Sequence, residues 1–333
     1  MEFSSRAGGV GILGLGAVLP ERAVSNDELA QRLDTSDEWI RTRTGIRERR
    51  YAAPEVATSD LAVAAARQAL ADARIAPEQL DWIICATTSP DNPFPATASR
   101  VQATIGAGRA AAFDLMACCS GWLYGVALLQ GLIRSGSCRY GLVIGAEVLS
   151  RIINWQDRST AVLVGDGAGA AVLGPVAEGA GILSILAGSD GDGYEHIIMP
   201  AGGSRMRATA ETVAAGLNAF HMNGREVFKW AVRQVPEAAD RALELAGLGV
   251  GDIDLFVPHQ ANLRIIEAAA ERLGLPEERT WVNIERYGNI SAACIPVGLY
   301  EARACGRLLP GQRLLTVAFG GGLTWAAAVM RWM

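Results

Sequence analysis

Residues 113–122 read Phe-Asp-Leu-Met-Ala-Cys-Cys-Ser-Gly-Trp and are the part of this sequence best suited to nucleophilic chemistry. We predict a buried strand at 111–115, a turn at 117–119 and an apolar helix at 123–133. A thiol at such a turn lies where unpaired helix N–H groups and the positive end of the helix dipole stabilise a thiolate. Most free cysteines are nevertheless small core residues, so Cys119 needs partners before it can be interpreted as a nucleophile.

Two polar residues in the second half of the chain are candidate partners. His259 follows an apolar strand, and α/β folds place their chemistry at strand ends. Asn289 lies in a Tyr-Gly-Asn-Ile-Ser turn. Taken singly, such a histidine is more often structural and such an asparagine more often a turn former.

An internal repeat in the sequence predicts that these residues lie close together. Alanine-rich helices alternate with short β-branched strands from residue 59 onward, which predicts an α/β fold with helices packed on a sheet. The pattern recurs after roughly 170 residues, as expected of a duplicated unit. The first copy has elements at 60–73, 82–87, 111–115, 123–133 and 140–146. The second has them at 225–246, 254–259, 281–289, 292–304 and 314–319.

In this alignment Cys119 and Asn289 occupy equivalent turns, and two copies placed back to back bring such turns together. A thiolate can accept an acyl group from a thioester. A neutral imidazole and an asparagine amide can then donate hydrogen bonds to a carbonyl oxygen as enolate charge develops on it. Backbone N–H groups of Cys119 and of the Gly-Gly-Gly run at 320–322 can form a second oxyanion hole.

Composition limits the other possibilities. The chain has 333 residues, of which 50% are hydrophobic, enough for one large domain or two fused halves. We expect no membrane-spanning helix, and residues 1–9 do not have the pattern of a signal peptide. The net charge of -5 argues against general nucleic-acid binding. The charged stretch at 41–50 is expected to be exposed, as a solvated loop or an anion-binding mouth.

The cysteines favour a reducing compartment. Six cysteines show no C-x-x-C spacing, and the chain has only three histidines, so we expect no metal site. We interpret the cysteines as reduced thiols of a cytoplasmic protein. A redox pair of the adjacent Cys118 and Cys119 is a poor alternative, because adjacent cysteines form only strained disulfides. The glycine-rich run at 165–170 lacks the Lys-Ser/Thr of a phosphate loop and is interpreted as structural.

Taken together, the motifs resemble β-ketoacyl-[acyl-carrier-protein] synthase III, within the thiolase-like superfamily, nearly end to end. The matching segments are Thr-Ser-Asp-Glu-Trp-Ile at 35–40, Arg-Thr-Gly-Ile at 43–46, Ala-Cys-Cys-Ser-Gly at 117–121, Gly-Asp-Gly-Ala-Gly-Ala at 165–170, Met-Asn-Gly-Arg-Glu-Val-Phe-Lys at 222–229, Val-Pro-His-Gln-Ala-Asn at 257–262, Tyr-Gly-Asn at 287–289 and Gly-Gly-Gly-Leu-Thr-Trp at 320–325. The resemblance implies a five-layer αβαβα fold with two pseudo-symmetric halves, 1–174 and 175–333, and a homodimer.

The resemblance also implies the site residues. The catalytic triad would be Cys119, His259 and Asn289, with Gly121 selecting Cys119 over Cys118. Backbone N–H groups of Cys119 and Gly321 would form the oxyanion hole. Coenzyme A would contact Trp39, Arg43, Arg158 and Asn262, with the adenine against Trp39 and Arg158. Acyl-carrier protein would contact Lys229, Gln260, Ala261, Asn262, Leu263, Arg264 and Arg272. The acyl pocket would involve Phe94 (inserted by the partner subunit), Trp122, Leu149, Val164 and Met222.

The implied reaction is a two-step decarboxylating Claisen condensation of an acyl-coenzyme A with malonyl-acyl-carrier protein, initiating fatty-acid synthesis. The acyl-coenzyme A is a substrate, and no cofactor is expected. Departures from the family pattern at Ile290, Val164, Trp122 and Ala326 leave the acyl preference open. One alternative is a secondary-metabolite relative, of polyketide or quinolone type, that uses the same triad for another condensation or acyl transfer. Another is a non-catalytic acyl-thioester binder.

Overall fold

Two β-sheets separated by helices form the frame of the molecule, and the structure, a computed structural model, describes residues 8–333. The first sheet has the strand order β1-β7-β6-β4-β5 and the second the order β11-β12-β13-β8. The first consists of β1 (Gly9–Val18), β7 (Asp166–Val176), β6 (Gly141–Val148), β4 (Trp82–Ala86) and β5 (Ala111–Leu115). The second consists of β11 (Leu255–Pro258), β12 (Arg313–Gly320), β13 (Thr324–Arg331) and β8 (Gly181–Ser189).

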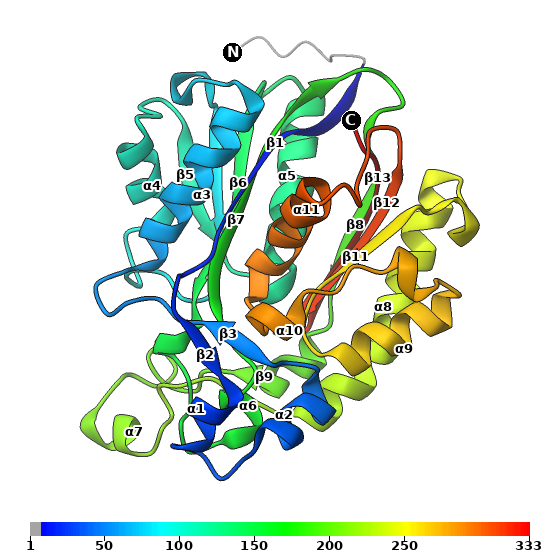
Figure 1. The fold of residues 1–333 in the computed structure, drawn as a ribbon. Helices are drawn as coiled ribbons and strands as arrows, with labels where there is room; N and C mark the ends of the chain where they lie inside the picture. The colour runs from blue at the N-terminus through cyan, green and yellow to red at the C-terminus, as the bar shows by residue number, and fades with distance from the viewer. Residues whose placement is uncertain (1–7) are drawn as a thin grey trace.

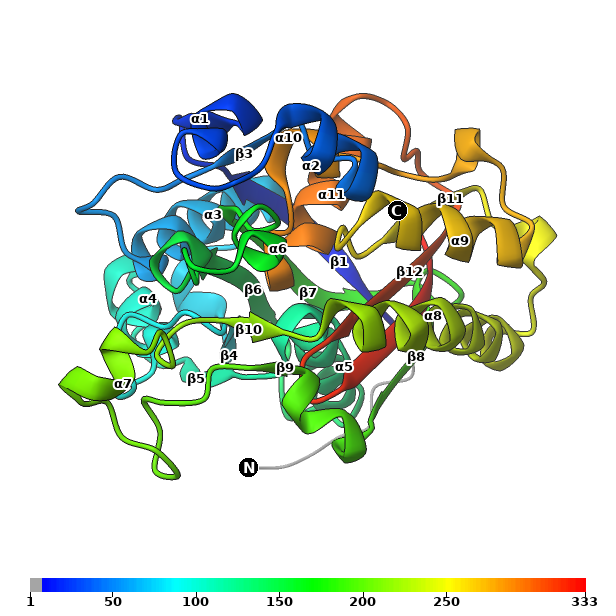
Figure 2. The ribbon, with the colours of Figure 1, turned by 90° about the horizontal axis from the view of Figure 1, so that it is seen from below.

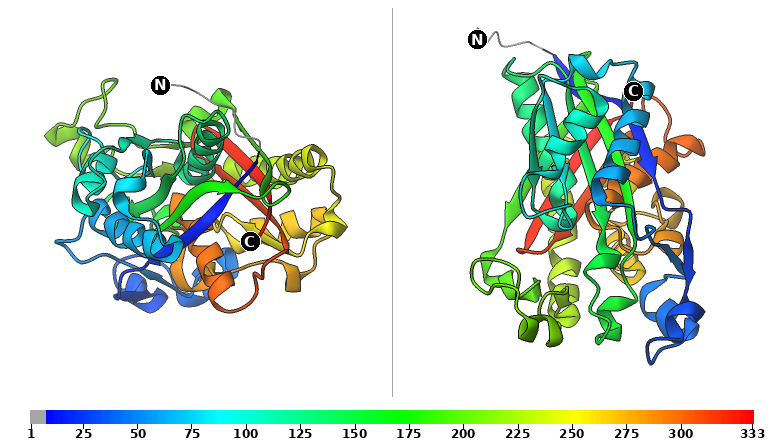
Figure 3. Two further views of the ribbon diagram at one scale, coloured as in Figure 1. Left: turned by 90° about the horizontal axis from the view of Figure 1, so that it is seen from above. Right: turned by 90° about the vertical axis from the view of Figure 1, so that its left-hand side faces the viewer.

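Helices lie between the sheets and on both outer faces (Figure 1). The outer helices are α3 (Thr58–Ala73) and α4 (Thr97–Ile105) on one side, and α8 (Gly224–Ala246) and α9 (Leu263–Leu273) on the other. The central layer consists of α5 (Gly121–Arg134) and α11 (Cys294–Ala304). Figure 3 shows from above how the strands of the two sheets run between these helices. The predicted α/β class and five-layer αβαβα architecture are therefore confirmed.

Shorter elements gather at one end of the layers, seen from below in Figure 2. They are β2 (Ala23–Ser25), α1 (Asn26–Ala30), α2 (Asp37–Thr44), β3 (Glu48–Arg50), α6 (Arg158–Ala161), β9 (Ile197–Ile198), α7 (Ala210–Ala214), β10 (His221–Met222) and α10 (Ile284–Tyr287). Serine side chains start two of the helices, because Ser25 and Ser36 each accept a 3.1 Å hydrogen bond from the backbone N–H three residues later. None of the described helices is both long and apolar enough to span a membrane.

Small residues allow the layers to pack closely. The alanines of α3 that face the first sheet are fully buried. A Cβ at Gly16 of β1 would lie 2.2 Å from the Ala65 carbonyl oxygen, so only glycine fits there. The glycine-rich run at 165–170 enters β7, where a Cβ at Gly169 would lie 2.8 Å from Pro296 of α11. That run therefore serves close packing against the central helices.

Two sequence-based predictions about the fold are wrong. Residues 281–289 do not form a strand: they contain the short helix α10, and Asn289 makes only an isolated bridge to Val164. The charged stretch at 41–50 is not exposed throughout, because Arg49 is fully buried. Its guanidinium donates to the Val24 and Val162 carbonyl oxygens and to the Asn26 side chain, which compensates for the lost hydration.

The register of the predicted repeat is also displaced. Cys118 and Ser291 both have left-handed backbone angles, with φ of 47° and 48°. Each starts a single 3-10 turn, η2 (Cys118–Ser120) or η7 (Ser291–Ala293), that leads directly into a central helix. Cys119 is therefore the structural equivalent of Ala292, not of Asn289. The two turns do lie together, as the repeat predicted, but Asn289 lies two residues before its turn.

Gly145 of β6 allows the η7 turn to approach the first sheet. We predict that Gly145→Ala lowers the free energy of unfolding by about 1 to 3 kcal/mol, because the new Cβ would lie 2.2 Å from the Ala292 carbonyl oxygen. As a control, Gly131→Ala, at an exposed position of α5 with open space around it, should raise it by about 0.5 to 1 kcal/mol. Urea unfolding measures both, and equal effects of the two substitutions would contradict this packing argument.

Candidate active site

Cys119 lies at the first turn of the central helix α5. The turn is fixed by hydroxyl groups: Ser120 Oγ donates to the Ala117 carbonyl oxygen (2.7 Å) and lies 2.7 Å from Thr324 Oγ1. Thr324 also donates to the Ala117 oxygen at 3.1 Å. These bonds hold the left-handed backbone of Cys118, which costs free energy in a non-glycine residue. The sequence therefore presents Cys119 at a helix N-terminus, as predicted.

The Gly-Gly-Gly loop at 320–322 lies against both cysteines. A Cβ at Gly320 would lie 2.6 Å from the Cys119 backbone nitrogen, and one at Gly321 would lie 2.9 Å from Cys118 Sγ. The Gly321 backbone acts against the rise that burial causes in the pKa of the Cys118 thiol. Glycine is required for this close approach. The oxyanion role of Cys119 and Gly321 stays a prediction.

Asn289 has one defined orientation. Its Oδ1 accepts hydrogen bonds from the Ser291 backbone N–H at 2.8 Å and from the Cys294 thiol at 3.8 Å. Its backbone is held by Leu163, whose carbonyl oxygen accepts from the Asn289 N–H at 2.8 Å. Because the oxygen is occupied, the amide Nδ2 group is the part of this side chain left to donate to another group.

His259 continues β11 and is 2% exposed. Its backbone N–H donates to the Val317 carbonyl oxygen at 2.8 Å, and its ring meets the edge of Phe319 at 5.4 Å between centroids. Neither ring nitrogen has a hydrogen-bond partner. Burial lowers the pKa of His259 to about 3, so the imidazole is neutral at physiological pH. A buried imidazole with both nitrogens unpaired is poised for a substrate group.

Cys294 and Ser291 connect the three predicted triad residues. Cys294 Sγ lies 3.9 Å from the Gln260 carbonyl oxygen, one residue after His259, and 3.8 Å from Asn289 Oδ1. The η7 turn that Ser291 begins packs against the η2 turn that contains Cys119. The structure thus brings the η2 turn, the end of β11 and Asn289 to one place. The sequence analysis missed Ser291 and Cys294, which follow Asn289 in a segment interpreted only as a turn and a helix.

Burial opposes ionisation of the nucleophile candidate. It raises the pKa of the Cys119 thiol well above its usual value, and the nearby Ser291 side chain acts against this rise. The thiolate stabilisation expected from the helix end therefore competes with the loss of hydration. In the resting protein the thiol is protonated, and its proton must move before the sulfur can attack.

The residues implied for coenzyme A gather around Trp39. The guanidinium carbons of Arg43 and Arg158 lie 4.8 Å and 5.0 Å from the Trp39 ring centroid. Asn262 Nδ2 donates to the Arg43 carbonyl oxygen at 3.0 Å, which joins α9 to α2. Arg158 also pairs with Asp34 at 3.2 Å. An aromatic ring flanked by two cations is therefore built at the edge of the site.

The residues implied for the carrier protein divide into surface and interior. Lys229, Arg264 and Arg272 are exposed. Gln260 is 1% exposed and cannot face a partner. Its amide donates to the Pro258 and Trp281 carbonyl oxygens and accepts from two backbone N–H groups at 283 and 284. Gln260 is thus a buried structural residue, and its assignment to the carrier-protein surface is corrected. Ala261, Asn262 and Leu263 are half-buried.

The acyl-pocket residues divide in the same way. Leu149 and Val164 are buried in one apolar cluster, and Met222 packs against it. Trp122 is 1% exposed and belongs to a different cluster, between the sheets, with Leu123 and Val126. Its assignment beside Leu149 and Val164 is therefore not supported. Phe94, in contrast, is 85% exposed.

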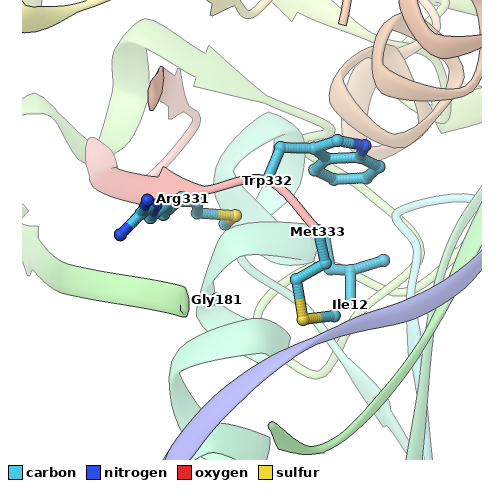
Figure 4. A pocket seen from close by; sticks show the side chains of 6 residues that line it. Ile12, Gly181, Arg331, Trp332 and Met333 are labelled. Carbon is cyan, nitrogen blue, oxygen red and sulfur yellow. The ribbon is translucent and has the colours of Figure 1, made fainter. Parts of the chain in front are cut away.

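A separate pocket lies at the far end of β13 and is unrelated to this site (Figure 4). It is lined by Ile12, Gly181, Met330, Arg331, Trp332 and Met333. Thr324, at the other end of β13, is the residue that contacts the nucleophile turn. Among residues 8–333, no cluster of three or more His, Cys, Asp or Glu side chains is arranged to hold a metal ion.

His259 should make stability depend on pH. Its folded-state pKa of about 3 lies below the unfolded value of 6.5, so between these values the unfolded chain binds a proton that the folded chain does not. Stability should therefore fall as pH falls below 6.5, by up to about 1.4 kcal/mol per pH unit from this residue. We predict that His259→Asn removes this component. Urea unfolding near neutrality and at mildly acid pH tests it, and an unchanged difference between variant and wild type would contradict it.

Comparisons with known proteins agree with this architecture. The family 3-oxoacyl-[acyl-carrier-protein] synthase III matches residues 113–191, and its C-terminal model matches 243–332. A beta-ketoacyl-[acyl-carrier-protein] synthase III of Symbiobacterium thermophilum is 59% identical, over 97% of this chain and 98% of the relative.

Solved structures are similar to this one over nearly the whole chain. The synthase III of Thermus thermophilus is 51% identical with a TM-score of 0.90, over 97% of this chain and 99% of that one. A priming β-ketosynthase from the R1128 polyketide pathway is 36% identical with a TM-score of 0.90, over 97% and 96%. With this identity over nearly its whole length, the chain belongs to the beta-ketoacyl-[acyl-carrier-protein] synthase III family.

Proposed function

We propose that this protein condenses an acyl-coenzyme A starter with malonyl-acyl-carrier protein, with loss of carbon dioxide, and so initiates fatty-acid synthesis. The observation that carries the proposal is the neutral, buried His259 with two unpaired ring nitrogens, beside an Asn289 amide oriented to donate. Together with a thiol at a helix N-terminus, these groups suit a reaction that passes through an acyl-enzyme and an enolate.

The first step forms the acyl-enzyme. The Cys119 sulfur attacks the thioester carbonyl carbon, and the carbon–sulfur bond to coenzyme A breaks. Backbone N–H groups of Cys119 and Gly321 would stabilise the oxyanion of the tetrahedral intermediate. Coenzyme A would enter past Trp39, Arg43, Arg158 and Asn262, with the adenine displacing one of the two guanidinium groups from the indole face.

The second step uses His259 and Asn289. Both would donate hydrogen bonds to the malonyl thioester oxygen, which becomes an enolate oxygen as the carboxylate leaves as carbon dioxide. The enolate carbon then attacks the acyl carbonyl carbon, and the Cys119 thiolate departs. A neutral imidazole suits this role, because a cation in so buried a place would be strongly destabilised.

The carrier protein would dock beside α8 and α9. Lys229, Arg264 and Arg272 are exposed there, with Ala261 and Leu263 between them and the site. Arg264 lies 5.5 Å above the Phe228 ring, which fixes the direction of its side chain. An enzyme of net charge -5 needs such a local basic surface to attract an acidic partner.

We also propose a homodimer that acts in the cytoplasm. The edge strand β5 carries no neighbour on its outer side within the described residues, and edge strands favour pairing with another chain. Close to it in sequence, Phe94 and Met116 are 85% and 73% exposed, unusually so for apolar side chains. In a dimer Phe94 would fill the pocket formed by Leu149, Val164 and Met222 of the partner subunit. The six free cysteines favour a reducing compartment.

A secondary-metabolite condensing enzyme is the second candidate. The likeness to a priming β-ketosynthase of a polyketide pathway and the small Val164 in the pocket cluster favour it. Turnover of malonyl-carrier protein with acetyl-, branched- and long-chain acyl-coenzyme A donors distinguishes the two. A non-catalytic binder is disfavoured, because all three reactive side chains are present.

We predict that Cys119→Ala abolishes the acyl-enzyme while the protein stays folded, because only the attacking sulfur is lost. Intact-protein mass spectrometry after incubation with a panel of acyl-coenzyme A donors measures the mass increase. Cys118→Ala is the matched control and should still be acylated. Acylation retained in Cys119→Ala and lost in Cys118→Ala would overturn the choice of nucleophile.

The dimer has its own test. We predict that Phe94→Glu raises the dimer dissociation constant at least tenfold, because it places a charge in an apolar interface. Sedimentation analysis over a range of concentrations measures this constant. Leu245→Glu, at a 50% exposed position on α8, should leave it unchanged. A wild-type protein that sediments as a monomer at all concentrations would refute the dimer.

A further inference from the structure

Gln260 is a buried amide, one residue after the histidine of the predicted triad, that the proposed reaction does not use. It is 1% exposed. Its side-chain oxygen accepts hydrogen bonds from the backbone N–H groups of Asn283 at 3.0 Å and Ile284 at 3.2 Å. Its amide nitrogen donates to the carbonyl oxygens of Pro258 at 2.9 Å and Trp281 at 3.1 Å. Two donated and two accepted hydrogen bonds are the full capacity of a glutamine side chain.

These hydrogen bonds replace a missing piece of β-ladder. The Trp281 N–H donates to the Phe256 carbonyl oxygen of β11 at 2.8 Å, in a parallel bridge. The next bonds of such a ladder would join the N–H of residue 258 to the Trp281 oxygen, and the Asn283 N–H to the Pro258 oxygen. Proline has no N–H to donate. The Gln260 side chain bonds to all three remaining groups instead, and so joins the end of β11 to the start of α10.

The first consequence concerns the backbone of His259. Its N–H donates to the Val317 carbonyl oxygen of β12 at 2.8 Å, which holds it from one side. The Gln260 amide holds the preceding carbonyl group, that of Pro258, from the other side. Neither nitrogen of the imidazole has a partner within the described residues, and the ring contacts the edge of Phe319. The place of the imidazole therefore depends on its backbone, which Gln260 helps to fix.

The second consequence concerns Asn289. The N–H groups that Gln260 accepts from lie at the start of α10, the helix that leads through Gly288 to Asn289. The backbone carbonyl oxygen of Gln260 also lies 3.9 Å from Cys294 Sγ, and the same sulfur lies 3.8 Å from Asn289 Oδ1. Gln260 thus contacts the chain on both sides of Asn289.

The proposed second step requires His259 and Asn289 to be placed accurately. Both would donate to a single enolate oxygen, although they lie on different segments of the chain. No hydrogen bond joins their side chains, because within residues 8–333 neither imidazole nitrogen has a partner. Donors stabilise a developing charge best when they are already fixed before the charge appears. A group that contacts both segments can supply this fixed geometry.

We propose that Gln260 is a positioning residue that fixes His259 and Asn289 relative to each other as donors to the enolate oxygen. It acts through the backbone of both segments and does not itself touch the substrate. The inference rests on the proposed function, because it takes these two side chains as the donors of the second step. The first step should not need Gln260, since Ser120 and Thr324 hold the turn that carries Cys119.

Two other roles for Gln260 predict different kinetics. A contact with the carrier protein would make its loss raise the KM for malonyl-acyl-carrier protein and leave kcat unchanged. A role in stability alone would make its loss lower the melting temperature and reduce neither step selectively. A positioning role predicts a lower kcat for decarboxylation, with the KM for the carrier protein and the rate of acylation unchanged.

The experiment compares the two steps in Gln260→Met and Gln260→Glu. Met has a similar length and makes none of the four hydrogen bonds, whereas Glu keeps the shape but cannot donate when ionised. Intact-protein mass spectrometry measures acylation of Cys119, and release of carbon dioxide from malonyl-acyl-carrier protein measures the second step. We expect acylation at the wild-type rate and a kcat for carbon dioxide release that is lower by about a hundredfold.

Ser184→Ala is the matched control for general damage. Ser184 is also buried in the second sheet, where its hydroxyl donates to the Ala242 carbonyl oxygen at 2.6 Å. This variant should lower the melting temperature and leave both rates unchanged. Thermal unfolding checks each variant, and Gln260→Met serves if Gln260→Glu does not fold.

A folded Gln260→Met with wild-type kcat would overturn the proposal, whether its KM rises or not. An equal loss of acylation and decarboxylation would overturn it as well, because the damage would then not be confined to the two donors. Failure of the proposed function has a different signature. In that case the wild type itself would form no acyl-enzyme or release no carbon dioxide.

Discussion

The rest of this structure depends on the contact between the N-termini of two central helices. The central helices α5 and α11 both begin at a single 3-10 turn, each entered through a left-handed residue, Cys118 or Ser291. Residues 145, 320 and 321 are glycines, and a side chain at any of them would collide with one of these two turns. The close packing places a thiol, an amide and an imidazole in a space from which most water is excluded. The layers of the fold serve to hold that geometry.

Because this site excludes most water, a buried charge there would be strongly destabilised, and the groups inside it are mostly uncharged. His259 is neutral and Cys119 is protonated at rest. Glu147, in the buried strand β6, accepts hydrogen bonds from the neutral hydroxyl and backbone N–H groups of Thr88 and Ser89. The positive charges stay at the edge, on the Arg43 and Arg158 guanidinium groups beside Trp39. The guanidinium groups around Trp39 thus keep their charge at the surface, whereas His259 and Cys119 inside the site carry none.

The sequence allowed the layers to be predicted, because alternating helices and strands are local signals, whereas the triad of Cys119, His259 and Asn289 stays a prediction. The displaced repeat shows where such signals fail. Residues 281–289 have the apolar pattern of a strand, yet Gln260 takes two of their backbone N–H groups, and no strand forms. Gln260 itself was misassigned, because a polar residue after a strand looks exposed until its partners are known. Ser291 and Cys294 were missed, since only the folded chain shows that both lie against the Asn289 side chain. The division into halves at residue 174 stays a prediction.

Arg49 limits how far this protein can be treated as modular. Its guanidinium joins Val24 and Asn26, in β2 and at the start of α1, to Val162 in the loop that precedes β7. Its Cβ also lies where Gly165 and Gly288, on either side of the Val164–Asn289 bridge, leave room for it. Residues 23–50, the loop before β7 and the turn at Gly288 and Asn289 therefore share one buried anchor. A chimaera that exchanges residues 23–50 for those of another protein would have to carry both ends of this anchor, so this segment and the loop before β7 can be replaced only together.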